Sequence, residues 1–135
     1  MILHIGVIDV PEPEGSTTGN VATILEEKYG LFSHFADSQI DKIAANLTES
    51  FQGALETLMM GHTPSNPFAA ATSQIDQDFR HFLDIEEMAK LGVPGVPTKA
   101  ALMGKSIRFK RRVGPRRPSF IDSGVLQTSL KSWVE

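Results

Sequence analysis

Apolar residues recur at three- and four-residue steps between Ile40 and Leu58, and this repeat constrains the fold more than any other feature of the sequence. Residues with that spacing lie along one side of an α-helix. The repeat therefore predicts a long central helix from about Ser33 to Met60, ended by Gly61. The residues expected on its buried stripe are Ile40, Ile43, Ala44, Leu47, Phe51, Ala54, Leu55 and Leu58.

Two shorter elements are predicted before this helix. Residues 2–10 are rich in β-branched side chains and Pro11 ends the run, which indicates a strand rather than a signal peptide or a membrane span. A short helix should follow, with Thr18 or Asn20 as its cap and Gly30 as its end. The residues expected on its buried side are Val21, Ile24 and Leu25.

Three more helices are predicted after the central one. One runs from about Thr72 to Leu91, Thr98 caps a second over 99–103 that leads into Gly104, and Asp122 caps a third. Together the patterns predict an α+β, helix-dominated single domain with an N-terminal strand, a long central helix, an extended basic arm and a short C-terminal helix. The residues expected to face inward are Ile75, Phe79, Phe82, Leu83 and Met88 in the first, and Leu126, Leu130, Trp133 and Val134 in the last.

The distribution of charge divides this domain at Thr98. Residues 1–98 hold fourteen acids and four bases, whereas residues 99–135 hold nine bases and two acids. The net charge of −3 therefore hides an acidic helical body, 1–98, joined to a basic arm and C-terminal helix, 99–135. The basic arm, residues 105–117, alternates partly and is broken at Gly114-Pro115, which favours an edge strand or an extended segment. Such asymmetry indicates a polyanionic partner or the acidic face of a neighbouring subunit.

The residue types needed for catalysis do not form a recognisable pattern. The four histidines are scattered without the i, i+4 spacing of helical zinc ligands, and cysteine is absent. The glycine clusters match neither the dinucleotide fingerprint nor the P-loop. We therefore expect no enzyme, no metal site and no cofactor. The acids Asp76, Asp78, Asp84, Glu86 and Glu87 interleave with apolar residues and are expected on the solvated face of their helix.

Three interpretations of the basic arm remain open. Its cations can meet an acidic protein surface, bind nucleic acid, or belong to a solvated loop. Phosphate binding would weaken steeply with salt, and Phe109 and Phe120 could stack on bases. The acidic remainder would repel nucleic acid, however, and the prolines and glycines of the arm favour an extended protein-binding segment. Contact with a subunit or partner is the favoured hypothesis, with a nucleic-acid-binding module as the alternative.

The C-terminal phrase from Arg117 to Val134 resembles a segment of tailed-bacteriophage virion-morphogenesis proteins, the neck and tail-completion proteins of the head–tail junction. Their pattern is a proline, then Asp-Thr-Gly, then Leu two residues on and Ser-Ile or a similar pair. The matching residues here are Pro118, Asp122, Ser123, Gly124, Leu126 and Ser129-Leu130, with Ser123 in place of the family's threonine.

The resemblance implies a structural protein that forms a homo-oligomeric ring in the virion and occupies the host cytoplasm during assembly. Its partners would be copies of itself and neighbouring connector or tail proteins. DNA would pass through the channel without specific binding, no membrane would be involved, and no catalytic residues are carried over. The expected interface comprises Arg108, Lys110, Arg111, Arg112, Arg116 and Arg117 against an acidic neighbour, Phe120 and Trp133 as apolar anchors, and Asp122 and Gly124 at the helix start.

Overall fold

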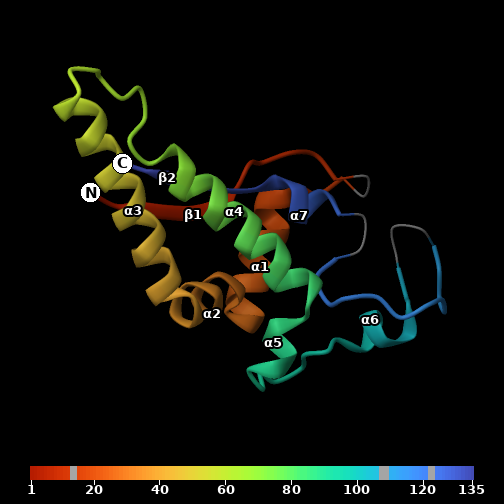
Figure 1. The fold of residues 1–135 in the computed structure, drawn as a ribbon. Coiled ribbons are helices and arrows are strands. Elements are labelled where there is room, and N and C mark those ends of the chain that lie inside the picture. Colours follow the sequence, from red (N-terminus) through yellow and green to blue (C-terminus); the bar gives the residue numbers. More distant parts are fainter. Residues whose placement is uncertain (13–14, 107–109, 122–123) are drawn as a thin grey trace.

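The computed structural model describes residues 1–135 except 13–14, 107–109 and 122–123 (Figure 1). Its described part is dominated by helices, with one small sheet that joins the two ends of the chain. This confirms the expected helix-dominated α+β class. In chain order the elements are β1 (Leu3–Val7), α1 (Thr18–Tyr29), α2 (Leu31–Ser38), α3 (Ile40–Met59), α4 (Ala69–Asp84), α5 (Glu87–Lys90), α6 (Lys99–Met103), α7 (Val125–Ser129) and β2 (Leu130–Val134).

The sheet pairs β1 with β2 in antiparallel register, from Leu3 opposite Val134 to Val7 opposite Leu130. The N and C termini therefore lie side by side (Figure 1). The predicted N-terminal strand is confirmed. The predicted C-terminal helical stripe is wrong after Ser129, because Leu130 and Trp133 belong to β2. Pairing with β1 supplies backbone hydrogen bonds that a longer helix would otherwise have made internally.

Local capping fixes the ends of two helices where the sequence placed them. The Thr98 side chain accepts a hydrogen bond from the Ala101 N–H at the start of α6, and Gly104 ends that helix in the left-handed conformation. Gly30 ends α1 in the same way. The cap of α1 is Thr17 rather than Thr18 or Asn20. Thr18 is buried instead, and its hydroxyl donates to the Ile8 carbonyl at 2.7 Å.

Two predicted helices are each divided in the structure. The segment 33–60 contains α2 and α3, which meet at Gln39 with φ −110° and ψ 9°. The segment 72–91 contains α4 and α5, separated at Ile85-Glu86, where Glu86 takes a positive φ of 52°. Each break lets the second helix change direction while the side chains of both helices still reach one core.

The core forms where α2, α4 and the sheet meet. Phe35 of α2 stacks on Phe79 of α4 with ring centroids 4.2 Å apart, and Phe82 meets Phe35 edge-on at 5.3 Å. Leu130 of β2 closes the same cluster. All five residues expected to face inward from the predicted third helix are buried, namely Ile75, Phe79, Phe82, Leu83 and Met88.

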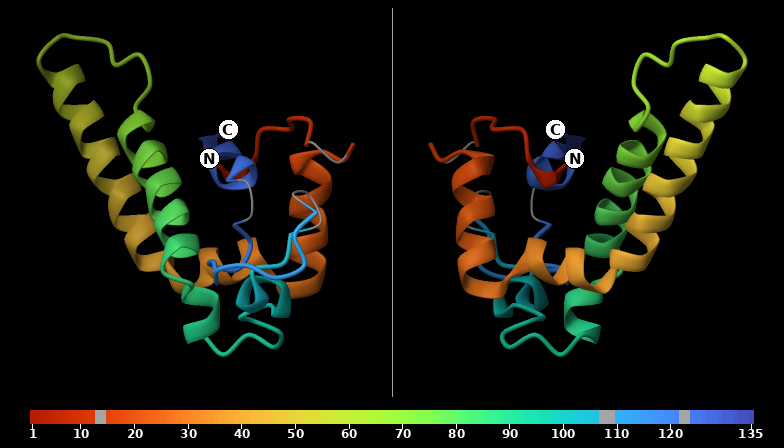
Figure 2. Two further views of the ribbon diagram at one scale, coloured as in Figure 1. Left: turned by 90° about the vertical axis from the view of Figure 1, so that its right-hand side faces the viewer. Right: turned by 90° about the vertical axis from the view of Figure 1, so that its left-hand side faces the viewer.

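The elements are arranged in layers around α4. Figure 2 shows α3 outermost, then α4, then the sheet, then α1 on the other side. The loop that joins α3 to α4 lies at the far end of this helical pair (Figure 2). Within the described residues, α3 therefore has α4 on one side and no further layer beyond it, which decides the exposure of its apolar residues.

Candidate functional site

The apolar face of α3 is largely uncovered, so its predicted burial is wrong. Of the expected stripe only Ile43 and Ala54 are buried. The large exposed members are Ile40 at 57%, Phe51 at 49%, Leu55 at 43% and Leu58 at 52%. We call these four residues the α3 stripe.

Helix geometry explains this exposure. At 3.6 residues per turn, Ile43 and Ala54 point in nearly the same direction, whereas Ile40 and Leu58 point about 60° away from Ile43. α4 packs on the side of Ile43 and Ala54 and so covers only one edge of the apolar residues. The remaining edge stays open to solvent.

Further apolar side chains extend the α3 stripe. Phe51 stacks on Phe68 at 6.3 Å, and both residues line a hollow of about 300 Å³ together with Met1 and Leu47. Met59 and Met60 at the end of the helix are exposed as well. Contiguous apolar patches of this kind commonly mark interaction surfaces.

Acidic residues outnumber basic ones on α3 and in the neighbouring sequence. Asp41, Glu49 and Glu56 are exposed on α3. The only base of the helix, Lys42, is engaged by Asp78 of α4, with 2.8 Å between Nζ and Oδ1. Across residues 31–78 the sequence has six acids and one base. At 3.6 residues per turn Asp41 lies beside the α3 stripe, whereas Glu49 and Glu56 point to the opposite side of the helix.

Several cations of the basic arm bind their own chain rather than project from it. The Arg111 Nε donates to the Gly104 carbonyl at 2.7 Å, and Arg116 pairs with Glu86 at 2.7 Å. Arg117 donates to the carbonyls of Lys105 and Ile121 at 2.8 and 3.3 Å. Arg116 therefore ties the basic arm to the body, whereas Arg111 and Arg117 bind residues at the two ends of the arm itself. Of the other expected interface cations, Lys110 and Arg112 are exposed, and Arg108 lies outside the described residues.

In the described part of the basic arm, one isolated antiparallel bridge joins Ser106 to Arg111 and no regular strand is formed. Ser106 and Arg111 exchange backbone hydrogen bonds of 2.8 and 2.7 Å, and Lys110 has a φ of 51°. The Gly114 N–H then donates to the Met103 carbonyl, which brings the returning chain back onto α6. The predicted alternation over 107–109 lies outside the described residues.

The remaining predicted interface residues fall in different environments. Phe120 is half-buried and packs on Tyr29 at 5.0 Å, so it serves this chain's own packing. Trp133 is 47% exposed and stacks on His4 at 5.1 Å. Gly124 caps α7 with a φ of 80°, and an added Cβ would meet nothing described within 4 Å, so the turn and not close packing accounts for glycine here. Asp122 lies outside the described residues.

Asp76 is the polar residue whose environment the sequence did not predict. It is buried rather than solvated, and its Oδ1 accepts the Ser132 N–H at 2.6 Å and the Ser132 hydroxyl at 2.7 Å. Lys131 Nζ lies 3.5 Å from its Oδ2. Asp76 thus fastens β2 to α4. Other acids of this region are also engaged, since Asp84 accepts from Gln127 and Glu86 accepts from the Ser119 N–H.

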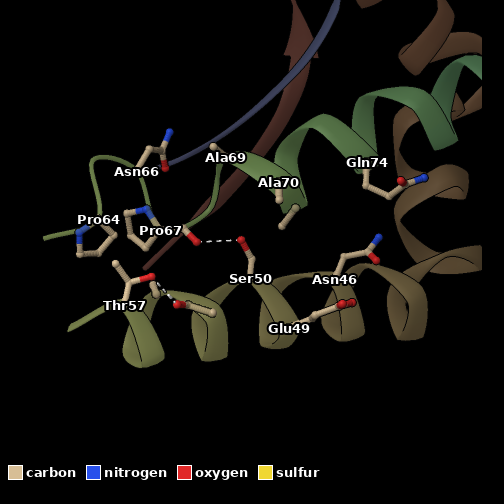
Figure 3. A pocket seen from close by; sticks show the side chains of 13 residues that line it. Asn46, Glu49, Ser50, Thr57, Pro64, Asn66, Pro67, Ala69, Ala70 and Gln74 are labelled. Atoms are coloured by element: carbon tan, nitrogen blue, oxygen red, sulfur yellow. Dashed lines mark hydrogen bonds between the residues drawn. The ribbon is translucent and has the colours of Figure 1, made fainter. Parts of the chain in front are cut away.

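A polar cleft of about 570 Å³ lies between α3 and α4 near their connecting loop (Figure 3). Ser50 closes part of it by donating to the Pro67 carbonyl at 2.7 Å, and Asn46 has a buried side-chain nitrogen without a hydrogen-bond partner. Glu49 is the one ionisable residue in its lining. A single carboxyl group without a second acidic or basic side chain gives this cleft no general acid–base pair.

The histidines give no metal centre within the described residues. His34, His62 and His81 are exposed on α2, on the loop after α3 and on α4. His4 instead shares a hydrogen bond of 2.7 Å with Glu135. No group of three or more His, Asp or Glu side chains in the described part of the chain is arranged to hold a metal ion. In the same part, every helix is too short or too polar to cross a membrane.

In comparisons with known proteins, no family model, no curated protein and no solved structure matches this chain. The functional argument therefore rests on the uncovered face of α3, on the cations near α6 and on the C-terminal phrase.

Proposed function

We propose that this chain is a structural subunit of a tailed-bacteriophage head–tail junction, a neck or tail-completion protein that assembles into a homo-oligomeric ring. The observation that carries the proposal is the α3 stripe. A surface helix of a globular protein normally turns its apolar side toward the core. Here most of that side faces outward, which a second protein surface would cover.

The C-terminal phrase agrees with this proposal at the residues that the structure describes. Leu126 and Leu130, which match the apolar positions of the phage pattern, are both buried. Gly124 occupies the glycine position and adopts a positive φ at the start of α7. The described residues of the phrase therefore take part in this chain's own packing.

A nucleic-acid-binding module is the second candidate, and one observation favours it. Lys99, Lys105, Lys110 and Arg112 are exposed, and their side chains have no ion pair or hydrogen bond within the described residues. Four phosphate contacts would give a salt slope of roughly 3 to 4. Against this candidate, Phe120 packs on Tyr29 and is not free to stack on a base.

Electron microscopy tests the proposed function at two levels. The purified chain should form closed rings of one rotational symmetry. In purified virions of the source phage, an antibody against the chain should label the junction between head and tail. A chain that stays monomeric, or that is absent from the virion, contradicts the proposal.

A further inference from the structure

We infer that the outer edge of β1 is a docking site, where an extended, positively charged segment of a partner protein adds as a third strand of the sheet. Strand addition of this kind joins two chains through backbone hydrogen bonds. The inference goes beyond the proposed function and does not depend on it, because the site lies on the α1 side of the sheet and contains no residue of the α3 stripe (Figure 2).

β1 uses only every second residue to bond to β2. Ile2 and Glu135, beside the paired strands, exchange two backbone hydrogen bonds of 3.1 and 2.9 Å. Bonded residues alternate along an antiparallel strand, so the same phase turns the N–H and C=O groups of Leu3, Ile5 and Val7 away from β2. Within the described residues, none of these N–H and C=O groups has a hydrogen-bond partner.

The opposite edge of the sheet, at β2, is capped by side chains of α4. The Ser132 N–H donates to Asp76 Oδ1 at 2.6 Å, and Arg80 Nη2 donates to the Leu130 carbonyl at 3.3 Å. The chain therefore closes the edge at β2 with its own side chains, whereas in the described structure it leaves the edge at β1 open.

Nothing in the sequence of β1 protects its open edge. Natural sheets protect an exposed edge with lysine, proline, a bulge or a covering segment. β1 contains no lysine, carboxylate or proline, and its five residues pair with β2 in continuous register. The side chains of Leu3, Ile5 and Val7 pack on the core, so the strand is held in place while its edge remains available for pairing.

A hollow of about 470 Å³ adjoins this edge and limits what can enter. It lies between residues 5–7 of β1, one face of α1 and Phe32 of α2. The residues of α1 that line it follow at three- and four-residue steps, namely Gly19, Ala22, Thr23, Glu26 and Glu27. α1 therefore stands beyond the edge, where it leaves room for a single extended segment but would collide with a second folded sheet.

The lining of the hollow defines the chemistry of the segment. It holds two carboxylates, Glu26 and Glu27, and no base. Glu26 accepts the Phe32 N–H at 2.7 Å, whereas Glu27 is exposed and has no partner in the described part of the chain. Ala22 and Phe32 supply apolar surface. The matching segment is therefore extended, with apolar side chains for the hollow and a lysine or arginine that pairs with Glu27.

Amide hydrogen exchange followed by NMR tests the pairing directly. The probe is a short capped peptide of alternating valine and arginine, since valine favours strands and arginine binds carboxylates. Without peptide, the N–H groups of Leu3, Ile5 and Val7 should exchange fast and those of His4 and Gly6 slowly, because only the latter bond to β2. Saturating peptide should slow exchange at the first three positions about tenfold or more and leave the other two nearly unchanged.

Two N-methylated peptides separate strand pairing from other modes of binding. In one the valine amides are methylated, and in the other the arginine amides. Only one of these two sets can face β1, because successive amides of a strand point to opposite edges. One peptide should therefore lose affinity about tenfold or more, while the other binds nearly like the unmodified probe.

Variants of the chain locate the site. Glu27→Lys should weaken binding of the probe about threefold to tenfold. Glu56→Lys, a matched change of an exposed acid on α3, should bind like wild type. Leu55→Gln with Leu58→Gln, which removes apolar surface from the α3 stripe, should also bind like wild type. Circular dichroism confirms that each variant keeps its secondary structure.

The remaining outcomes decide against the inference. It is overturned if the probe does not bind, if both methylated peptides behave alike, or if Leu3, Ile5 and Val7 are already protected in the dilute protein. Protection that appears only when the protein alone is concentrated would identify the occupant as a second copy and also overturn it. If the probe binds as expected but the chain forms no ring, the proposed function fails and this inference stands.

Discussion

Replacing Asp76 should destabilise the fold more than any comparable change of an acidic residue on the surface. Asp76 is buried and its Oδ1 accepts both the backbone N–H and the hydroxyl of Ser132. In Asp76→Ala the Ser132 hydroxyl can still donate to the Thr72 carbonyl, 3.0 Å away, but the Ser132 N–H loses its acceptor. An orphaned buried donor and the loss of bonds to a charged group together predict a cost of about 2–4 kcal/mol.

The conservative variant Asp76→Asn separates the loss of the hydrogen-bond acceptor from the loss of the charge. Asp76→Asn keeps an oxygen at the Oδ1 position, so both bonds from Ser132 persist without the charge, and we expect a loss of about 1–2 kcal/mol. Asp37→Ala, an exposed acid on α2, is the control and should change the free energy of unfolding by less than about 0.5 kcal/mol.

Urea unfolding followed by far-UV circular dichroism measures these differences. All variants are compared in the Leu55→Gln, Leu58→Gln background, because assembly would otherwise add to the apparent stability. If Asp76→Ala costs no more than the Asp37 control, or no more than Asp76→Asn, the role assigned to Asp76 in fastening β2 is refuted.

Two further predictions concern Asp9 and Gly104. The Gly19 N–H donates to Asp9, and this bond, with a smaller contribution from the Thr17 side chain, lowers the pKa of Asp9 below its ordinary value of 3.8. Wild type should therefore be more stable than Asp9→Ala at neutral pH. The difference between their urea midpoints should shrink as the pH falls below 3.8 toward the lowered pKa. A difference that grows in acid would contradict this reasoning. Gly104→Ala should cost more than about 2 kcal/mol, because φ is 64° and a Cβ would lie 2.4 Å from the backbone of Gly114 and Pro115. At Gly61, where φ is 85° and an added Cβ meets open space, Gly61→Ala should cost only about 1 kcal/mol. If the two variants lower the melting temperature equally, the contact at Gly104 is unimportant.

Elements whose ends depend on local chemistry were predictable from the sequence. Thr98 begins α6 and Gly104 ends it, because a side-chain cap and a left-handed glycine act within a few residues. The prediction of which residues of 72–91 face inward was also correct, because Phe79 and Phe82 lie on the apolar side of that segment.

Features that depend on distant partners were not predictable. Periodicity identified the residues that share the apolar side of α3, but not that α4 would cover only the edge holding Ile43 and Ala54. Residues 130–134 carried a helical spacing, yet β1, at the other end of the sequence, pairs with them as a strand. From the sequence alone Asp76 could not be distinguished from an acid on a solvated helix face, because its partner Ser132 belongs to that distant strand.

Among the proposed interface residues the same distinction holds. The sequence identified a basic segment after α6, but it could not show that Arg111, Arg116 and Arg117 bind carbonyls and a carboxylate of their own chain. Those partners come from Gly104, Glu86 and Lys105, whose positions only the folded loop defines. The exposed face of α3 had no sequence signal, because an uncovered stripe and a buried one have the same spacing.

The molar mass of the wild-type chain in a salt series tests the central claim most directly. Multi-angle light scattering at about 0.05 M salt should give one discrete multiple of 14.8 kDa that stays constant as protein concentration rises, since a ring is closed. At about 0.5 M salt the mass should fall, because exposed ion pairs are screened. A mass of 14.8 kDa at every salt and protein concentration would contradict the account.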